Sequence, residues 1–305
     1  MKTSLYIPLE FLFEDMATAG EGLFRIGQAA EAAGFDACNL TDHPAPTAAW
    51  RRSGGHDALD PFAALSFIAA ATKRIRLHTH IVVLPYRNPF ITAKSITTLD
   101  VVSGGRAIIG IGAGYMKGEY FAVGQDFDTR GPAMDEALSV MKLAWSGEPV
   151  NFDGATFNAR DILPTPVPVR KPHPTLWGGG NSRSAIRRAA EHCDGFSPFF
   201  AGAEQAVRNK TVPLETHADL ADKIAIYREE LDRLGREGDF DICSGPAQRP
   251  QGCNAEARQL YIDQAEELAG MGVNWMLASV PGASLGEFLD SIAWFGSEVR
   301  PGLPA

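Results

Sequence analysis

Residues 61–111 read PFAALSFIAAATKRIRLHTHIVVLPYRNPFITAKSITTLDVVSGGRAIIGI and contain one pattern twice. Each round is an apolar stretch of helix length followed by a shorter apolar run of strand length. The helix-length stretches are residues 61–71 and 89–102, and the strand-length runs are residues 75–83 and 107–111. This alternation is typical of parallel βαβ units.

The same alternation extends in both directions along the chain. It predicts eight strands, at residues 4–7, 37–40, 75–83, 107–111, 175–177, 195–198, 240–244 and 274–280. It predicts eight helices, at about residues 23–33, 61–71, 89–102, 132–145, 182–191, 220–234, 255–271 and 285–299. Eight of each favour a closed TIM (β/α)8 barrel over an open doubly wound sheet. A chain of 305 residues can form such a barrel as one domain, residues 1–305.

Residues 147–174 depart from this rhythm. The triplets 150–152 and 155–157 flank Asp153-Gly154, which favours a two-residue hairpin turn. The proline-rich run 164–174 fits neither a helix nor a central strand. We therefore predict a β-hairpin insertion after the fourth helix and an extended return to the fifth strand. A second irregular stretch, residues 245–254, follows the seventh strand and is expected to border the site.

Composition narrows the classes of protein to consider. With 45% hydrophobic and 21% charged residues, the chain has the make-up of a globular protein. The formal net charge of −9 and the scattered basic residues argue against a nucleic-acid partner. Arg183, Arg187 and Arg188 have helical spacing and are expected to form a solvated helix face.

Targeting and cysteine patterns point to the cytoplasm. Residues 1–9 lack the pattern of an export signal, and no apolar run approaches the length of a membrane span. We therefore expect no membrane partner. Cys38, Cys193, Cys243 and Cys253 include no CxxC pair, so neither a disulfide framework nor a zinc ribbon is indicated. Cys38 and Cys243 fall in predicted strands and are expected to be reduced and buried.

Asp42 and His43 directly follow the second predicted strand. In a barrel of this kind, the loops after the strands gather at the catalytic end. Histidine exchanges protons near neutral pH, and an adjacent carboxylate can orient it or contact a cofactor. His43 is therefore the candidate catalytic residue and Asp42 a candidate cofactor contact. A histidine that merely caps the strand fits the position equally well.

His78 and His80 lie on one side of the third predicted strand, because side chains alternate along a strand. In metal-dependent hydrolase barrels such a pair binds the ion. That site also needs histidines and a carboxylate at later strand ends, whereas His173, His192 and His217 lie elsewhere. We expect no metal, and predict that the pair fills the barrel or contacts a planar ligand.

Two glycine-rich stretches follow strands. Residues 110–114 close the fourth strand, too late in the chain for a dinucleotide-binding fingerprint, and at Gly112 and Gly114 a flat ring could approach the backbone. Residues 178–182 follow the fifth strand and open a helix, which makes them a candidate phosphate site or a plain capped turn. The residues predicted to hold phosphate are Gly179, Gly180, Asn181 and Ser182.

Residues after the fourth strand also lie near the predicted mouth of the barrel. Tyr115 and Met116 are candidates for a substrate pocket. Glu119 and Arg130 follow in the same loop, where each could reach the pocket, pair on the surface or cap the next helix. No role is assigned to them from the sequence.

In their order along the chain these stretches resemble the luciferase-like monooxygenase superfamily, especially its coenzyme F420-dependent oxidoreductase branch. The resemblance covers the first two thirds of the chain, matches residues 270–281 more loosely and matches residues 202–254 little. The residues that carry it include Thr41-Asp42-His43, Asp60-Pro61, Asn88-Pro89, Ser103-Gly104-Gly105-Arg106, Gly110-Ile111-Gly112-Ala113-Gly114, Glu119, Gly178-Gly179-Gly180-Asn181-Ser182 and Cys193-Asp194-Gly195-Phe196.

The resemblance implies a deazaflavin or isoalloxazine ring at the strand ends, with its phosphate on the turn after the fifth strand. Asp42 and His43 would then lie beside the ring, and Gly179 to Ser182 beside the phosphate. Relatives carry a non-prolyl cis peptide that aligns here with His80 and Ile81. The bulge at this bond would support the back of the ring.

The resemblance also bears on the substrate and on the oligomeric state. Sugar-phosphate dehydrogenases of the family have a glutamate directly after the Gly-x-Gly of the fourth strand, where this chain has Tyr115. The usual acid partner is missing there, so sugar-phosphate oxidation is not expected. Relatives commonly pair through early helices, and residues 61–71 and 89–102 are apolar enough for a symmetric homodimer.

The leading functional hypothesis is hydride transfer to or from a small organic substrate by bound F420, with His43 moving the proton. The alternative within the fold is an FMN-dependent monooxygenase that takes reduced flavin from a partner reductase and adds oxygen. From other classes, we keep a metal-dependent hydrolase that uses His78 and His80, and a non-catalytic flavin-binding protein.

Overall fold

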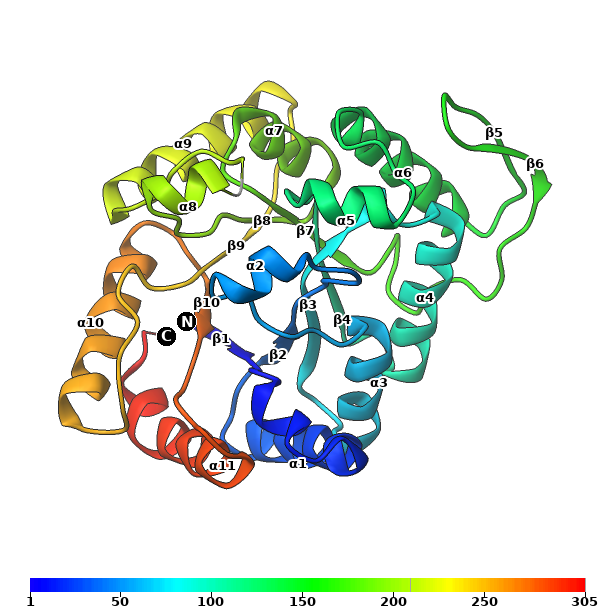
Figure 1. Cartoon of the computed structure of the whole chain (residues 1–305). Coiled ribbons are helices and arrows are strands. Elements are labelled where there is room, and N and C mark those ends of the chain that lie inside the picture. Colours follow the sequence, from blue (N-terminus) through cyan, green and yellow to red (C-terminus); the bar gives the residue numbers. More distant parts are fainter. Residues whose placement is uncertain (209, 305) are drawn as a thin grey trace.

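Eight parallel strands form a closed barrel with helices around it (Figure 1). The computed structural model describes residues 1–208 and 210–304. The barrel strands are β1 (Lys2–Tyr6), β2 (Ala37–Leu40), β3 (Arg76–Val83), β4 (Ala107–Gly112), β7 (Thr175–Gly179), β8 (Gly195–Ser197), β9 (Asp241–Ser244) and β10 (Trp275–Ala278). They follow one another around the barrel, and β10 pairs with β1 to close it. The predicted TIM barrel is confirmed.

The long helices are those that the sequence predicts. They are α1 (Ala19–Ala32), α3 (Pro61–Ala71), α4 (Pro89–Val102), α6 (Arg130–Ala144), α7 (Arg183–His192), α9 (His217–Arg233), α10 (Ala255–Gly270) and α11 (Leu285–Trp294). α11 continues into one π-helical turn, η4 (Phe295–Val299), so the helix reaches the predicted end at residue 299 with a wider last turn. Three short helices were not predicted: α2 (Ala48–Arg52), α5 (Lys117–Ala122) and α8 (Ala203–Arg208).

Local sequence explains where the long helices begin. Asp60 precedes α3, and its carboxylate accepts hydrogen bonds from the backbone N–H groups of Phe62 and Ala63. Asn88 caps α4 in the same way. In both helices a proline follows the cap, at a first-turn position where no backbone N–H is needed.

The predicted insertion after α6 is a two-stranded hairpin of β5 (Val150–Asp153) and β6 (Asn158–Ile162). Asp153 pairs with Asn158, so the turn has four residues, not the predicted Asp153-Gly154, and residues 155–157 are not a strand. The carboxylate of Glu136 in α6 accepts hydrogen bonds from the N–H groups of Thr156 and Phe157. This tertiary contact stabilises the longer turn. It could not be predicted from the local sequence Asp153-Gly154.

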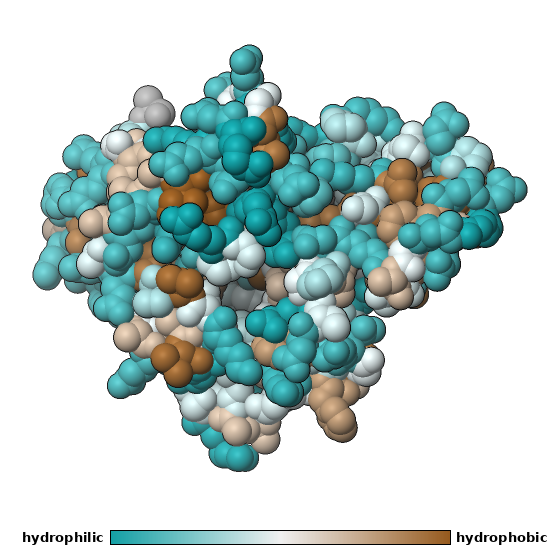
Figure 2. All heavy atoms as spheres, turned by 90° about the horizontal axis from the view of Figure 1, so that it is seen from above, coloured by the Kyte–Doolittle hydropathy of each residue, from teal (hydrophilic) through white to brown (hydrophobic). Residues whose placement is uncertain are grey.

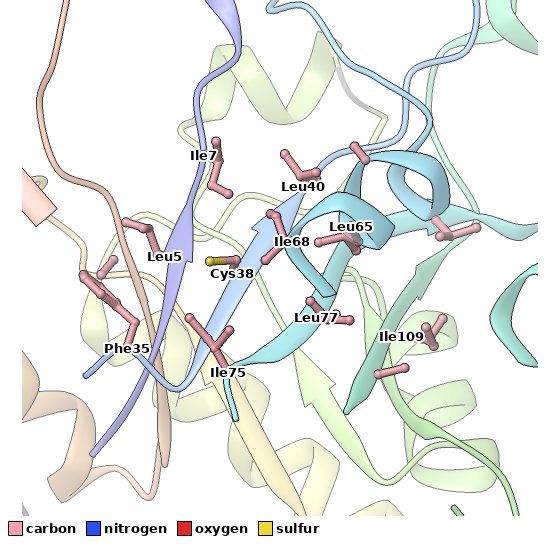
Figure 3. Packing of buried hydrophobic residues seen from close by; sticks show 14 of the residues in the cluster. Leu5, Ile7, Phe35, Cys38, Leu40, Leu65, Ile68, Ile75, Leu77 and Ile109 are labelled. Carbon is pink, nitrogen blue, oxygen red and sulfur yellow. The ribbon is translucent and has the colours of Figure 1, made fainter. Parts of the chain in front are cut away.

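The layer between the strands and the helices is apolar and fully buried. Figure 3 shows Leu5 of β1, Cys38 of β2 and Leu77 of β3 near one another, together with Leu65 and Ile68 of α3. Such a contiguous cluster supplies most of the hydrophobic stabilisation of a domain. It also holds the strand ends, and with them the loops of the site, in place.

The end of β3 packs against glycines in the neighbouring strands. The peptide bond between His80 and Ile81 is cis, as the family resemblance predicts, and the β3–β4 register shifts between Thr79 and Val82. A Cβ built on Gly112 would lie 1.9 Å from Cδ1 of Ile81. The side chain of Ile81 therefore takes space that the sequence interpretation left for a flat ring.

The remaining predictions about the surface and the cysteines have mixed outcomes. Cys38 and Cys243 are buried and free, as expected, whereas Cys253 is exposed. Arg188 was expected on a solvated face, but its side chain is only 11% exposed and binds Asp135 of α6. Figure 2 shows a mostly hydrophilic side of the molecule with hydrophobic residues in small separate groups. Within the described residues, no helix has the length and apolar character to cross a membrane.

Replacing Gly110 with alanine should destabilise the fold. Its Cβ would lie 2.3 Å from the backbone oxygen of Thr79, which cannot move without breaking the β3–β4 pairing. We expect a loss of about 1–3 kcal/mol, measured by urea unfolding. Gly270→Ala is the matched control, because a Cβ there meets nothing within 4 Å. Equal stabilities of the two variants would contradict this account of the strand packing.

Candidate active site

His43 lies just past β2, at the carboxyl end of the barrel. Its Nδ1 is 3.2 Å from Oε2 of Glu119, in the first turn of α5. The His43 side chain is 11% exposed and that of Glu119 is 1% exposed. The pair thus joins a buried carboxylate to an imidazole that keeps some access to solvent, which is an arrangement suited to proton transfer.

Glu119 also holds two other groups. Its Oε2 accepts a hydrogen bond of 3.0 Å from the hydroxyl of Tyr86, and its Oε1 accepts one of 3.2 Å from the backbone N–H of Ala45. Burial, and then the neighbouring Glu119 carboxylate, raise the pKa of Tyr86. Tyr86 therefore keeps its proton and remains a donor to Glu119 at neutral pH.

Three rings surround His43. The ring centroids of Trp50, His56 and Tyr115 lie 4.6, 5.1 and 6.2 Å from that of His43. We call Trp50, His56 and Tyr115 the aromatic cage. Burial is the main cause that lowers the pKa of His56, so at neutral pH this ring carries no charge. The predicted pocket residue Tyr115 is thus beside His43.

Asp42 points to a different set of partners. Its carboxylate, 3% exposed, accepts hydrogen bonds from the backbone N–H of Val83 at 3.1 Å and from Nη2 of Arg87 at 2.8 Å. Asp42 therefore anchors the end of β3. A contact between Asp42 and a cofactor ring stays a prediction.

His78 and His80 lie side by side, with ring centroids 5.3 Å apart. Nδ1 of His78 is 3.0 Å from Oγ of Ser4, and its ring packs edge-on against Trp177 in the barrel core. Nδ1 of His80 is buried without a hydrogen-bond partner among the described residues. Burial lowers the pKa of His80 to about 4, so it is neutral at pH 7. Across residues 1–208 and 210–304, no group of three or more possible ligands could hold a metal ion.

The glycine turn after β7 leads into α7 as predicted. Gly180 has φ +121°, a conformation that side chains rarely allow. The Asn181 side chain binds backbone groups of Phe199 and Val212, and Oγ of Ser182 caps α7 by accepting the Ala185 N–H. Both side chains thus have structural roles. Phosphate binding by the backbone of residues 179–182 stays a prediction.

Two other predicted residues have contacts that their positions in the sequence did not indicate. Met116 is buried, and its sulfur accepts a hydrogen bond from the Thr47 N–H just before α2, so it supports the segment that carries Trp50 and His56. Gly114, with φ +68°, leaves space for Val83 and Tyr86. Direct contacts of Met116, Gly112 and Gly114 with a ligand stay predictions.

Sequence reasoning missed Tyr86, Trp50 and His56, and it noted Glu119 without giving it a role. A tryptophan and a histidine shortly after the candidate catalytic histidine were a signal that could have found Trp50 and His56. Arg130, noted beside it, lies over the ring of Phe127 at 3.9 Å from the ring centroid. The interpretation that the acid partner is missing was incomplete, because Glu119 provides a carboxylate to His43.

Three comparisons place the chain among known proteins. F420-dependent glucose-6-phosphate dehydrogenase of Gordonia bronchialis is 30% identical over 220 residues, which are 70% of this chain and 62% of that protein. FMNH(2)-dependent dimethylsulfone monooxygenase of Pseudomonas putida is 28% identical over 173 residues, which are 56% of this chain and 46% of that protein. The matches thus span less than two thirds of either relative. Monooxygenase RslO1 from Streptomyces bottropensis shares the fold, with a TM-score of 0.79 and 17% identity over 99% of both chains.

A family model agrees with these relatives and with the resemblance found in the sequence. It is described as luciferase-like monooxygenase and matches residues 13–270. The matched region runs from before α1 to the end of α10, and so contains His43, Glu119 and the glycine turn. The chain therefore belongs to the luciferase-like monooxygenase family, a family of enzymes.

Proposed function

We propose that this protein is an oxidoreductase that uses bound coenzyme F420 to transfer a hydride to or from a small organic substrate. The observation that carries the proposal is the His43–Glu119 pair at the carboxyl end of a barrel of this family. It supplies the acid–base group that such a reaction needs. The Gordonia relative, named an F420-dependent dehydrogenase, supports the choice of cofactor.

The residues present fit a flavin-like ring with a phosphate. His80 has a buried ring nitrogen without a partner among the described residues, at the end of β3 where the family resemblance expects the ring. The backbone of Gly179, Gly180 and Asn181 precedes α7, where free N–H groups and the helix dipole favour an anion. Bound there, F420 would supply the hydride chemistry. The protein would hold it, orient the substrate and exchange the proton at His43.

FMN is the alternative cofactor. The Pseudomonas relative is named as FMNH(2)-dependent, and a ring with a phosphate would use the same residues. In that case the enzyme would act as a monooxygenase and would need reduced flavin from a partner reductase. A metal-dependent hydrolase is not proposed, because Nδ1 of His78 is bonded to Ser4 and no third ligand accompanies the histidines among the described residues.

Titration of the purified protein with F420 and with FMN tests the cofactor proposal. We expect F420 to bind at micromolar concentration and to shift its absorbance and fluorescence, and FMN to bind more weakly. Tighter binding of FMN would favour the monooxygenase alternative. If neither cofactor binds below about 1 mM, where binding is worth only about 4 kcal/mol, the proposal is wrong. Binding without turnover of any candidate substrate would favour a non-catalytic flavin-binding protein.

His43→Ala should lower turnover by roughly a hundredfold or more, the usual effect of losing a positioned acid–base group. Cofactor affinity and the urea midpoint should change little, because the ring keeps some solvent contact and lies outside the barrel core. His192→Ala, at the end of α7, is the control and should keep wild-type turnover. Unchanged turnover in His43→Ala would remove this residue from the mechanism.

We also propose a symmetric homodimer through α3 and α4. Phe67 of α3 and Ile91 and Val102 of α4 are 52%, 68% and 61% exposed, although they are large and apolar. The two helices pack against each other and form one surface (Figure 1). We expect light scattering of the wild-type protein to give twice the mass of one chain. Ile91→Asp should give the mass of a single chain. A wild-type monomer at micromolar concentration would contradict the proposal.

A further inference from the structure

We infer that Glu119 is a positioning residue that fixes which ring nitrogen of His43 carries the proton. The inference concerns His43 itself, and its catalytic consequence rests on the function proposed above. Three donors converge on the Glu119 carboxylate: the Ala45 N–H, the Tyr86 hydroxyl and Nδ1 of His43. His43 and Ala45 lie in the loop after β2, and Tyr86 lies in the turn after β3.

The hydrogen-bond chemistry decides the tautomer. An ionised carboxylate only accepts hydrogen bonds, so His43 can bond to it only through a protonated Nδ1. In neutral imidazole the other nitrogen, Nε2, then carries a lone pair. Glu119 therefore selects the tautomer in which Nε2 is the proton acceptor.

The position of the ring makes that nitrogen available. Nε2 of His43 has no hydrogen-bond partner among the described residues. The His43 side chain is 11% exposed, so the ring keeps some contact with solvent. The aromatic cage restricts rotation of the ring, since Trp50 and His56 lie within about 5 Å of it. Glu119 and the cage together hold one accessible basic nitrogen in a fixed place.

The same contact stabilises the ring after it takes up a proton. When Nε2 accepts a proton from a substrate hydroxyl, the imidazolium charge lies 3.2 Å from the carboxylate. In the reverse direction Nε2 returns the proton. Since Glu119 is only 1% exposed, water screens this interaction little. Glu119 thus acts on the substrate only through His43.

Tyr86 shares the carboxylate with His43. Its hydroxyl donates to Oε2, the same oxygen that faces His43. Removing this hydroxyl leaves the carboxylate in place, whereas Glu119→Gln removes it. The proton on Nδ1 should therefore persist in Tyr86→Phe and be lost in Glu119→Gln, a contrast that general damage to the fold would not produce.

The test is NMR of the full-length protein with ¹⁵N-labelled histidine, without cofactor. The His43 signal is identified by its absence in His43→Ala. We expect the wild-type ring to carry its proton on Nδ1 when neutral. In Glu119→Gln the amide oxygen can still accept the bond from the Ala45 N–H. The amide NH₂ group then faces Nδ1 of His43 and should shift the ring proton to Nε2. Tyr86→Phe keeps the carboxylate and should keep the proton on Nδ1.

Turnover gives the second readout. Glu119→Gln should lose roughly a hundredfold or more in turnover with a shifted pH profile, and Glu119→Asp should recover part of it. The matched control is Glu136→Gln, which removes a carboxylate that also accepts backbone N–H bonds but lies at the hairpin. It should leave both the His43 signal and turnover unchanged.

The outcomes separate this inference from the proposed function. If a folded Glu119→Gln variant keeps the wild-type tautomer of His43, the inference is overturned. If Glu119→Gln does not fold, loss of the proton from Nδ1 in Tyr86→Phe overturns it instead. If the NMR shifts appear as expected but no cofactor binds, the positioning role holds and the proposed function fails.

Discussion

The mouth of the barrel depends on how the side chain of Ile81 fits between neighbouring strands. A Cβ on Gly112 of β4 would collide with Cδ1 of Ile81, and one on Gly179 of β7 would lie 3.3 Å from its Cγ2. The absence of side chains at these two points of β4 and β7 leaves the space that the Ile81 side chain occupies. Protein interiors are close-packed, so a fit of this kind fixes where each strand ends.

The placement of the His43–Glu119 pair follows from this geometry. The carboxylate of Asp42 binds the Val83 N–H just beyond Ile81, which ties the end of β2 to the end of β3. His43 is the next residue, and Tyr86 lies in the turn that follows β3. Glu119 then joins His43 and Tyr86 to α5. Burying a carboxylate costs free energy unless hydrogen bonds compensate, and these two carboxylates each accept at least two.

Much of the barrel could be predicted from periodicity, and less of the site. Each predicted strand has its counterpart, because strand-length apolar runs between helices reflect burial on both faces. The turn of the hairpin and the short helices α2, α5 and α8 could not be found that way. The turn depends on Glu136, and five or six residues are too few to show helical periodicity.

The residue types at positions 42, 43 and 115 indicated a site. The hydrogen-bond partners of these side chains could not be predicted from the sequence, because they are distant along the chain. Glu119, for example, lies 76 positions after His43.

The acid partner of His43 shows why a motif compared position by position can mislead. In the family pattern of the sugar-phosphate dehydrogenases a glutamate directly follows the Gly-x-Gly of β4. Because this chain has Tyr115 at that position, the carboxylate partner of His43 was interpreted as missing. The chain continues into α5, whose first turn brings Glu119 within 3.2 Å of Nδ1 of His43. Tyr115 instead joins the aromatic cage on another side of the same ring. The loop thus keeps a carboxylate for the histidine and replaces an acid at the first position with an aromatic ring. Since that position faces His43 with a neutral phenol whose pKa is raised by burial, its polarity and shape differ from those of a carboxylate. The difference changes the surroundings of the His43 ring, and not whether His43 has a carboxylate partner.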